Sequence, residues 1–310
     1  MRRYTGRHAP SPFVGLSMSR SLVARALGRL RQRADPVAPS LDPPSVERSA
    51  NAEPAIFVIG CQRSGTSLVR RILDSHSRIA CPAESRFLLT LLSVLEDDGA
   101  MRGLQGMGYE RPAVAAALRA FAGSFFQRYA AAAGKARWAD KTPQYVDLLD
   151  PLWEVFGPEA RFVMVFRDGM DVAFSLADPN RAYPAIDPHV RQAGGDVPAG
   201  AARFWAAQNQ KIDGFRHHHP EACVSVRYED LTTDPGPVLK QMFGFLGEPW
   251  EPAVVDYARF PHHGGGFEDP DVRRRRSIEP NSGRWRAWPD PVQVRVREAC
   301  EPMLARLGYG

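Results

Sequence analysis

The stretch AIFVIGCQRSGTSLVRRILDSH, residues 55–76, decides the fold predicted for this chain. It opens with an apolar run rich in β-forming residues at 55–59, and Gly60 ends this run. A polar loop with a second glycine follows, after which apolar side chains recur at helical spacing, at Leu68, Val69, Ile72 and Leu73. This order of strand, glycine loop and helix predicts an α/β protein. The N–H groups of such a loop and the positive end of the helix dipole bind an anion.

The loop has the glycine spacing of a nucleotide-binding loop but lacks its lysine. A nucleoside triphosphatase places Lys directly after the second glycine to reach the β- and γ-phosphates. Here Thr66 takes that position. The residues available to hold a shorter anion are Arg63, Ser64, Gly65, Thr66 and Ser67. The glycines alone also fit an ordinary turn between a strand and a helix.

Composition and charge indicate a globular chain with a basic balance. It has 310 residues, 44% of them hydrophobic, and a net charge of +5, which fits an anionic ligand or surface. No apolar run approaches the ~20 residues of a membrane-spanning helix, and none forms the core of about 7–15 residues of a signal peptide. We therefore expect a cytoplasmic protein with reduced thiols, because the four cysteines also lack metal-ligand spacing, at Cys61, Cys81, Cys223 and Cys300.

Residues 1–51 are predicted to form a basic, flexible tail in front of one domain at 52–310. The tail is rich in Arg, Ser, Pro and Ala, and no acidic residue precedes Asp35. Residues 19–33 have the pattern of a basic amphipathic helix. A loosely docked arm and a contact with an anionic membrane surface or acidic partner both fit this pattern, and the Arg-rich start also imitates a transit peptide.

A second anion pocket is predicted after the apolar run RFVMVF, residues 161–166. Ligands of open α/β sheets gather beyond the carboxyl ends of the strands, and Arg167 stands at such an end. Ser175 lies about two helical turns further on. A guanidinium and a hydroxyl suit a phosphate group, although Arg167 could equally pair with Asp168 or Asp171.

Two further residues are candidates for acid–base and charge chemistry. Glu84 follows the first helix in a short turn, where a carboxylate can act as a base or can pair with Arg86 or Arg78. Lys141 is expected in a loop, beside the positive end of a helix that begins at Pro143.

The remaining segments carry weaker signals. Residues 180–200 are rich in Pro and Gly and are expected to form a lid or acceptor loop, and 223–226 are expected to form a third strand. The three adjacent histidines at 217–219 suggest a metal site or, more simply, a solvated loop. The glycines at 264–266 indicate flexibility, and the Arg-rich stretch at 273–286 suits a loop that closes over a polyanionic ligand.

Taken together, these motifs resemble those of the sulfotransferases that use 3′-phosphoadenosine 5′-phosphosulfate (PAPS). The order is most similar to the tyrosylprotein sulfotransferase type and its bacterial relatives. The motifs are GCQRSGTSLVRRILDSH (60–76), PAESRF (82–87), DKTP (140–143), FRDGMDVAFSL (166–176), RYEDL (227–231) and SGRWR (282–286). The resemblance implies a P-loop-type, three-layer α/β fold with a mainly parallel sheet flanked by helices, and makes 52–310 a sulfotransferase domain.

The resemblance also implies how the donor is held. The loop 63–67 would bind the 5′-phosphosulfate, and Arg167 with Ser175 would bind the 3′-phosphate. Tyr228 would contact the nucleotide. Arg284 stands where the tyrosylprotein enzymes carry Lys, so the positive charge is kept.

For the chemistry, the resemblance implies Glu84 as the general base, with Lys141 and Ser277 steadying the sulfuryl group. The donor brings its own leaving group, so no metal is expected. One departure concerns Cys81, whose counterpart in the tyrosylprotein enzymes forms a disulfide with a cysteine at the position of Ala139. That partner is missing here, so the acceptor stays open.

The predicted activity is therefore sulfuryl transfer to a hydroxyl of a carbohydrate, lipid, small metabolite or peptide. The alternative is a P-loop kinase or nucleoside triphosphatase that acts on a small molecule. A nucleic-acid binder would use the basic charge but would leave Arg167 and Glu84 unexplained, so no nucleic-acid partner is expected.

Overall fold

The computed structural model describes residues 53–262 and 267–309. The predicted tail at 1–51 and the glycines at 264–266 lie outside the described residues. The described part contains a five-stranded sheet in the order β2-β3-β1-β4-β5, and every neighbouring pair is parallel. The strands are β1 (Ile56–Gly60), β2 (Ile79–Ala80), β3 (Arg137–Lys141), β4 (Arg161–Phe166) and β5 (Cys223–Arg227). The predicted α/β class and parallel sheet are thereby confirmed.

The central strands are apolar along their whole length because both faces of the sheet are covered. Phe57 and Ile59 of β1 pack into one hydrophobic cluster, whereas Ile56 and Val58 pack into a second cluster on the opposite face. This alternation follows from the two-residue period of a strand. A parallel sheet with both faces buried reads as a continuous hydrophobic run rather than as an alternating one.

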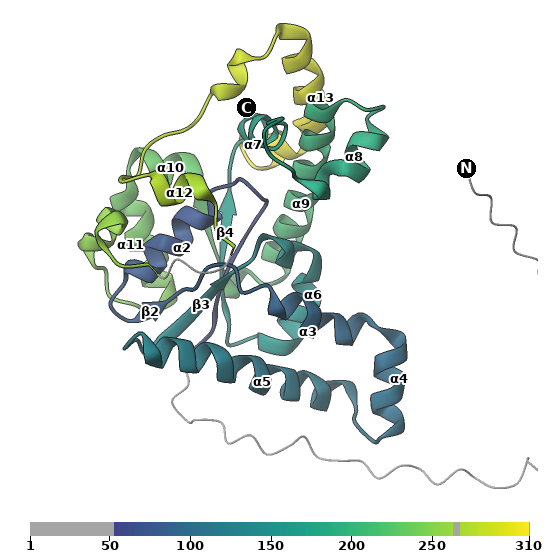
Figure 1. The fold of residues 1–310 in the computed structure, drawn as a ribbon, viewed down its shortest axis with the longest axis vertical. Helices are drawn as coiled ribbons and strands as arrows, with labels where there is room; N and C mark the ends of the chain where they lie inside the picture. The colour runs from purple at the N-terminus through teal and green to yellow at the C-terminus, as the bar shows by residue number, and fades with distance from the viewer. Residues whose placement is uncertain (1–52, 263–266, 310) are drawn as a thin grey trace, which may run out of the picture. The chain divides into compact units, whose positions relative to one another are not determined.

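Helices complete the three layers, as Figure 1 shows. The cluster around Phe57 includes side chains of α3 (Phe87–Glu96), α5 (Arg111–Ala132), α6 (Leu149–Phe156), α7 (Gly169–Leu176), α9 (Val197–His218) and α13 (Asp290–Arg306). The cluster around Val58 includes side chains of α2 (Thr66–Ser75), α10 (Tyr228–Thr233) and α11 (Pro235–Leu246). Shorter elements are α4 (Asp98–Gly106), α8 (Asp187–Gln192), α12 (Pro270–Arg274), and the 3₁₀ helices η1 (Pro143–Leu148), η2 (Pro184–Ile186), η3 (Pro220–Ala222), η4 (Pro252–Arg259) and η5 (Arg284–Ala287).

The prediction that Lys141 lies in a loop is wrong, because Lys141 is the last residue of β3. The sequence of this strand, RWADK, contains three charged residues, a composition that disfavours a strand prediction. Each charged side chain is nevertheless buried, and Arg137 at the other end of the strand pairs with Glu248 at 3.2 Å. Partners supplied by distant parts of the chain therefore make β3 possible.

Two other local predictions are also wrong. The expected loop at 180–200 contains η2, α8 and the first turn of α9, where the Asp196 carboxylate accepts a capping hydrogen bond from the Ala199 N–H at 3.0 Å. The three histidines do not form a solvated loop. His217 and His218 end α9, and the ring of His219 stacks on Trp153 with 3.8 Å between centroids.

Candidate functional site

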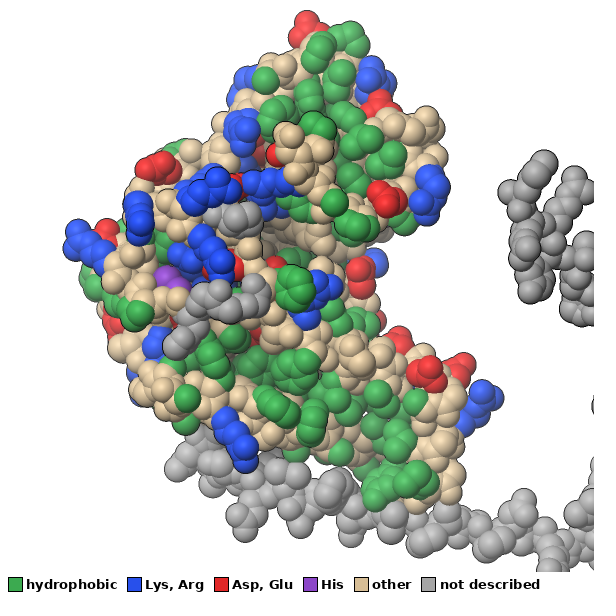
Figure 2. Space-filling model, viewed as in Figure 1, with side chains coloured by type: hydrophobic (Ala, Val, Ile, Leu, Met, Phe, Trp, Pro, Cys, Tyr) green, Lys and Arg blue, Asp and Glu red, His purple; other side chains and the backbone are tan. Residues whose placement is uncertain are grey.

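The candidate site lies at the carboxyl edge of the sheet, where all five strands end side by side. Segments that follow β1, β2, β4 and β5 carry Arg63, Glu84, Arg167 and Tyr228, and β3 itself ends at Lys141. A cavity of about 1030 Å³ opens there, lined by most of these side chains and by further basic residues. Figure 2 shows Lys and Arg side chains gathered around a hollow on this face. This edge is where ligands of open α/β sheets bind.

The glycine loop after β1 has a left-handed backbone at two positions and leads directly into a helix. Arg63 and Gly65 both have left-handed backbones, with φ of 70° and 96°. A Cβ atom at position 65 would lie 2.4 Å from the ring of Tyr228, so only glycine fits there. The ten-residue helix α2 begins directly after Gly65, and its first N–H groups have no helical acceptor. The hydroxyl of Ser64 is buried and has no partner among the described residues.

Arg167 lies directly against this loop. Its guanidinium donates to the backbone oxygen of Arg63 at 2.9 Å and also to the backbone oxygen of Asn281. It lies 4.3 Å from the centroid of the Tyr228 ring. The alternative pairing of Arg167 with a neighbouring acid is not seen, since Asp168 caps α7 by accepting from the Asp171 N–H. The Nε atom of Arg167 is buried and has no partner among the described residues.

A second, smaller cavity of about 330 Å³ adjoins the first. Its lining includes Arg63, Arg167, Ser175 and Arg284. The Arg63 Nε donates to the Ser175 hydroxyl at 2.9 Å, so the two predicted anion pockets meet at one side chain. The structure therefore brings the first-loop residues together with Arg167 and Ser175.

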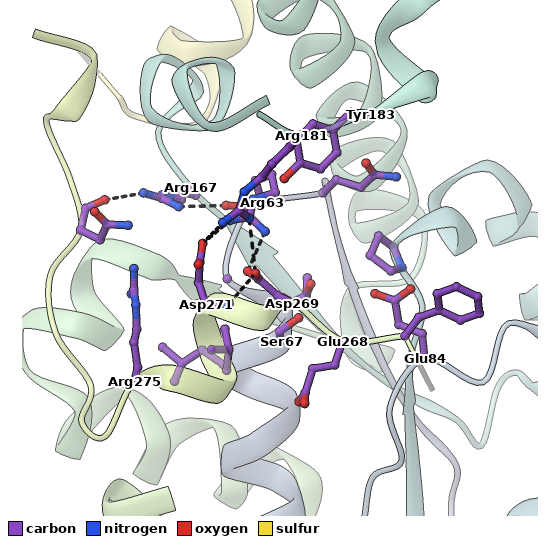
Figure 3. Close-up of a pocket in the computed structure, with 18 of the residues that line it drawn as sticks. Arg63, Ser67, Glu84, Arg167, Arg181, Tyr183, Glu268, Asp269, Asp271 and Arg275 are labelled. Atoms are coloured by element: carbon purple, nitrogen blue, oxygen red, sulfur yellow. Dashed lines mark hydrogen bonds and ion pairs between the residues drawn. The ribbon is translucent and has the colours of Figure 1, made fainter. Parts of the chain in front are cut away.

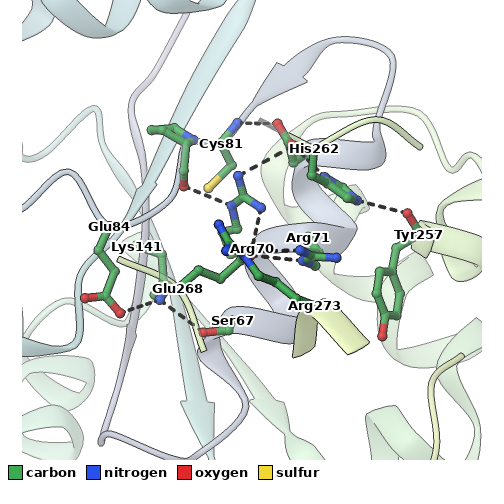
Figure 4. Close-up of polar contacts among 12 residues, drawn as sticks. Ser67, Arg70, Arg71, Cys81, Glu84, Lys141, Tyr257, His262, Glu268 and Arg273 are labelled. Carbon is green, nitrogen blue, oxygen red and sulfur yellow. Dashed lines mark hydrogen bonds and ion pairs between the residues drawn. The ribbon is translucent and has the colours of Figure 1, made fainter. Parts of the chain in front are cut away.

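Glu84, Lys141 and Ser67 form a hydrogen-bonded series (Figure 4). The Lys141 ammonium donates to Glu84 at 2.7 Å and to the Ser67 hydroxyl at 3.1 Å. Lys141 is almost completely buried, whereas Glu84 lines the large cavity. The proposed alternative partners of Glu84 are occupied elsewhere, because Arg78 pairs with Glu248 and Arg86 lies over the Phe267 ring.

The other predicted residues lie in the walls of these cavities. Tyr228 is buried, with its ring against Gly65, and its hydroxyl oxygen lies 3.4 Å from Arg275. Ser277 lines the large cavity and donates to Glu279 of its own loop at 2.5 Å. The Arg284 guanidinium lies 5.2 Å from the centroid of the Phe174 ring, beside the smaller cavity.

Sequence reasoning missed the acidic segment at residues 268–271, which lies over the glycine loop (Figure 3). The Arg63 guanidinium pairs with Asp269 at 2.6 Å and lies 3.5 Å from Asp271. Arg181 also pairs with both aspartates. In this view Arg63 and Ser67 lie between Arg167 on one side and Glu84 on the other. An anion that binds Arg63 must therefore compete with two carboxylates.

Glu268 holds this acidic segment against α2 through ion pairs with Arg70 and Arg71. Its carboxylate accepts hydrogen bonds from Arg70, Arg71 and Arg273 (Figure 4). Burial alone would raise the pKa of Glu268, but the arginines outweigh burial and lower this pKa to about 2. The backbone oxygen of Phe267 accepts from the Glu84 N–H at 3.0 Å. The available signal was EDPDVRRRR at 268–276, where acids directly precede the noticed arginines.

The described residues contain neither a cluster of metal ligands nor a helix that could span a membrane. No group of three or more His, Cys, Asp or Glu side chains is placed to hold a metal ion. No helix in the described part of the chain is long and apolar enough to cross a bilayer. All four cysteines are free, including Cys81.

These features define an α/β protein with a glycine loop and several basic side chains at the carboxyl edge of its parallel sheet. Two solved structures share its fold at 21% sequence identity. The sulfotransferase domain from the curacin biosynthetic pathway has a TM-score of 0.60 and covers 83% of this chain and 98% of its own. The sulfotransferase domain from the Synechococcus PCC 7002 olefin synthase has a TM-score of 0.55 and covers 82% and 95%.

The family follows from the sequence comparisons. The model of the sulfotransferase family matches residues 54–252, so the chain belongs to this family. Protein-tyrosine sulfotransferase 1 of Danio rerio is 28% identical over 83% of this chain and 72% of its own length. The protein-tyrosine sulfotransferase of Drosophila melanogaster is 26% identical over 83% of this chain, which spans only 52% of that relative. The protein is thus a transferase of the sulfotransferase type, as the motifs predicted.

Proposed function

We propose that the protein transfers the sulfuryl group of PAPS to an acceptor hydroxyl, with Glu84 as the general base. The observation that carries this proposal is the series Glu84–Lys141–Ser67, with separations of 2.7 and 3.1 Å. In this series the buried Lys141 ammonium links the Glu84 carboxylate, at the cavity wall, to Ser67 in the first turn of α2. A base, a cation and an anion cradle are what sulfuryl transfer requires.

The residues present fit PAPS as the donor. Ser64 Oγ and Arg167 Nε are buried polar atoms that have no partner among the described residues, and an anion would satisfy both. Loop 63–67 would hold the 5′-phosphosulfate, and Arg167 with Ser175 would hold the 3′-phosphate, assisted by Arg284. Tyr228 would contact the nucleotide. Arg63 lines both cavities, and this supports the proposal that one ligand spans the two.

The chain's own groups would divide the chemistry as follows. When bound, PAPS supplies an SO₃ group whose leaving group is the 5′-phosphate. Glu84 takes the proton from the acceptor hydroxyl, a role that typically contributes 10²–10⁴-fold in rate. Lys141 and Arg63 place positive charge where negative charge develops on the departing oxygen. Ser277, in the cavity wall, is proposed to assist at the sulfuryl group.

The acceptor is proposed to be a hydroxyl-bearing molecule. The two relatives described above are named for action on protein tyrosine, so a tyrosine peptide is one acceptor to test. Carbohydrates, lipids and small metabolites remain the other classes. The protein is incubated with ³⁵S-labelled PAPS and either a tyrosine peptide or a metabolite extract. Identification of the labelled product then shows which class of acceptor is sulfated.

Melting experiments test the donor. A ligand at 100 times its dissociation constant stabilises the folded state by about 2.7 kcal/mol. We expect a rise in Tm with 3′,5′-adenosine bisphosphate (PAP), the desulfated product, in the absence of added metal. A rise only with ATP and Mg²⁺, or only with an oligonucleotide at low salt, would overturn the proposal.

The variant Glu84→Gln tests the base. Turnover of PAPS should fall by about 10²–10⁴-fold, while the Tm shift with PAP stays unchanged. Glu298→Gln is the matched control, because Glu298 is exposed on α13 and lines neither cavity. Near-normal turnover of the Glu84 variant would remove Glu84 from the mechanism.

A further inference from the structure

Asp140 is a buried carboxylate beside the candidate site with no part in the chemistry proposed above. It is the penultimate residue of β3, and its exposed fraction is 0%. Successive side chains of a strand point to opposite faces. Lys141 accordingly reaches Ser67 on the α2 side of the sheet, whereas Asp140 reaches the other face and contacts Ser85 and Tyr145.

The contacts of Asp140 converge on one oxygen. The Ser85 hydroxyl donates to Asp140 Oδ2 at 2.8 Å, and the hydroxyl of the buried Tyr145 donates to the same atom. The other oxygen, Oδ1, has no partner among the described residues. Burying a carboxylate is unfavourable unless hydrogen bonds compensate for lost hydration. A carboxylate retained here with one oxygen unsatisfied needs an explanation beyond stability.

The explanation lies in Glu84, the residue that directly precedes Ser85. Two consecutive residues of one segment pair with two consecutive residues of the strand end, Glu84 with Lys141 at 2.7 Å and Ser85 with Asp140 at 2.8 Å. The next residue, Arg86, has a left-handed backbone with φ of 56°. A non-glycine residue keeps such a conformation only where its surroundings enforce it. The Ser85–Asp140 bond fixes the segment immediately before this strained residue.

We propose that Asp140 is a positioning residue that holds Glu84, through Ser85, beside Lys141 at the wall of the cavity. This inference rests on the proposed function, in which Glu84 is the base. Asp140 itself lies on the opposite face of the strand and takes no proton from the acceptor. Its place in the fold makes the position of the base depend on a buried charge.

The charge of Asp140 provides a readout that a purely structural residue would not give. Burial raises the pKa of Asp140 to about 6, although hydrogen bonds from Tyr145 and Ser85 oppose the shift. The titratable groups acting on it are Tyr145 of η1, Lys141 of β3 and Cys81 of the segment after β2. Protonation removes the charge, and a charge-assisted hydrogen bond is about twice as strong as a neutral one. Turnover should therefore decline as the pH falls through about 6.

The variant Asp140→Asn keeps the shape of the side chain and removes its charge. Turnover is measured as release of PAP from PAPS, first with water as the acceptor and then with the acceptor found by labelling. We expect kcat to fall by about 10–100-fold, because a displacement near 1 Å can cost this much, while the dissociation constant for PAP stays unchanged. The decline near pH 6 should disappear. Asp98→Asn, on α4 and outside both cavities, is the matched control.

The variant Ser85→Ala tests the route and serves if the asparagine variant does not fold. It should lower kcat without changing the affinity for PAP, and the double variant should lose no more than Asp140→Asn alone. An unchanged kcat in Ser85→Ala, additive losses in the double variant, or parallel losses of kcat and PAP affinity would each overturn the inference. Failure of the unaltered protein to bind PAP would instead refute the proposed function, and this inference with it.

Discussion

Replacing Asp269 with asparagine is expected to tighten the binding of PAP. Asp269 and Arg63 are only 16% exposed and lie 2.6 Å apart, so the carboxylate occupies the guanidinium that an anionic ligand needs. A hydrogen bond between charged groups contributes about 1.5–3 kcal/mol, and a neutral one contributes about 1. Weakening this competitor by ~1.4 kcal/mol corresponds to a tenfold lower dissociation constant. The segment should persist, because Asn is as good an N-cap as the Asp that caps α12 here.

Isothermal titration calorimetry with PAP, without added metal, measures the effect. Asp98→Asn is the control, since it changes the net charge equally from the exposed first turn of α4. Equal tightening in both variants would mean that long-range charge, rather than competition for Arg63, is responsible. An unchanged or weaker affinity in Asp269→Asn would refute the reasoning, because it would show that the carboxylate and the ligand do not compete.

Three further predictions concern single side chains. Arg167→Ala should weaken binding of PAP by about 10–100-fold, the loss of one charged hydrogen bond, while competition assays with 5′-AMP, which lacks the 3′-phosphate, show little change. Gly65→Ala should lower the free energy of unfolding in urea by more than about 1–2 kcal/mol, because φ is 96° and the added Cβ would also lie 2.4 Å from the Tyr228 ring. Gly103→Ala, where an added Cβ meets nothing within 4 Å, should not destabilise the protein. Glu268→Gln should lower the free energy of unfolding by about 3 kcal/mol, because Arg71 loses its charged partner and the buried Arg70 keeps only the longer pairing with Asp74, at 3.7 Å. The pKa of Glu268 is depressed from 4.5 to about 2, so its stabilisation is present above pH 4.5 and is lost toward pH 2, and acid unfolding of the variant should lack this component.

The core of the fold could be predicted because its signal is local. In β1 and β4 nearly every side chain is apolar, and all except the partly buried Arg161 are buried between two layers of helices. The strand β3 could not be predicted in the same way. Its buried charges at Arg137 and Lys141 depend on Glu248 and Glu84, which are distant in the sequence, so no window of the sequence contains the reason for its burial.

The candidate site likewise has one part that could be predicted from the sequence and one part that could not. Arg63 and Arg167 follow the two apolar strands, and the rule that ligands gather at the carboxyl edge was sufficient to expect them together. The contact between Arg63 and Asp269 joins residues 206 positions apart. A run of mixed charges at 268–276 has the same pattern whether it faces solvent or covers a pocket. The roles of all these residues stay predictions until the variants are measured.

The match to the family model stops at residue 252, yet the cavity takes part of its lining from residues 267–281. Part of the cavity wall is thus encoded outside the stretch that the family model matches. Grafting residues 253–289 from a relative onto this framework should change the affinity for PAP as well as the shape of the cavity, because this stretch carries Asp269 and Arg284. The wall of the cavity can therefore be altered through one late stretch of the chain, with the apolar strands β1 and β4 left intact.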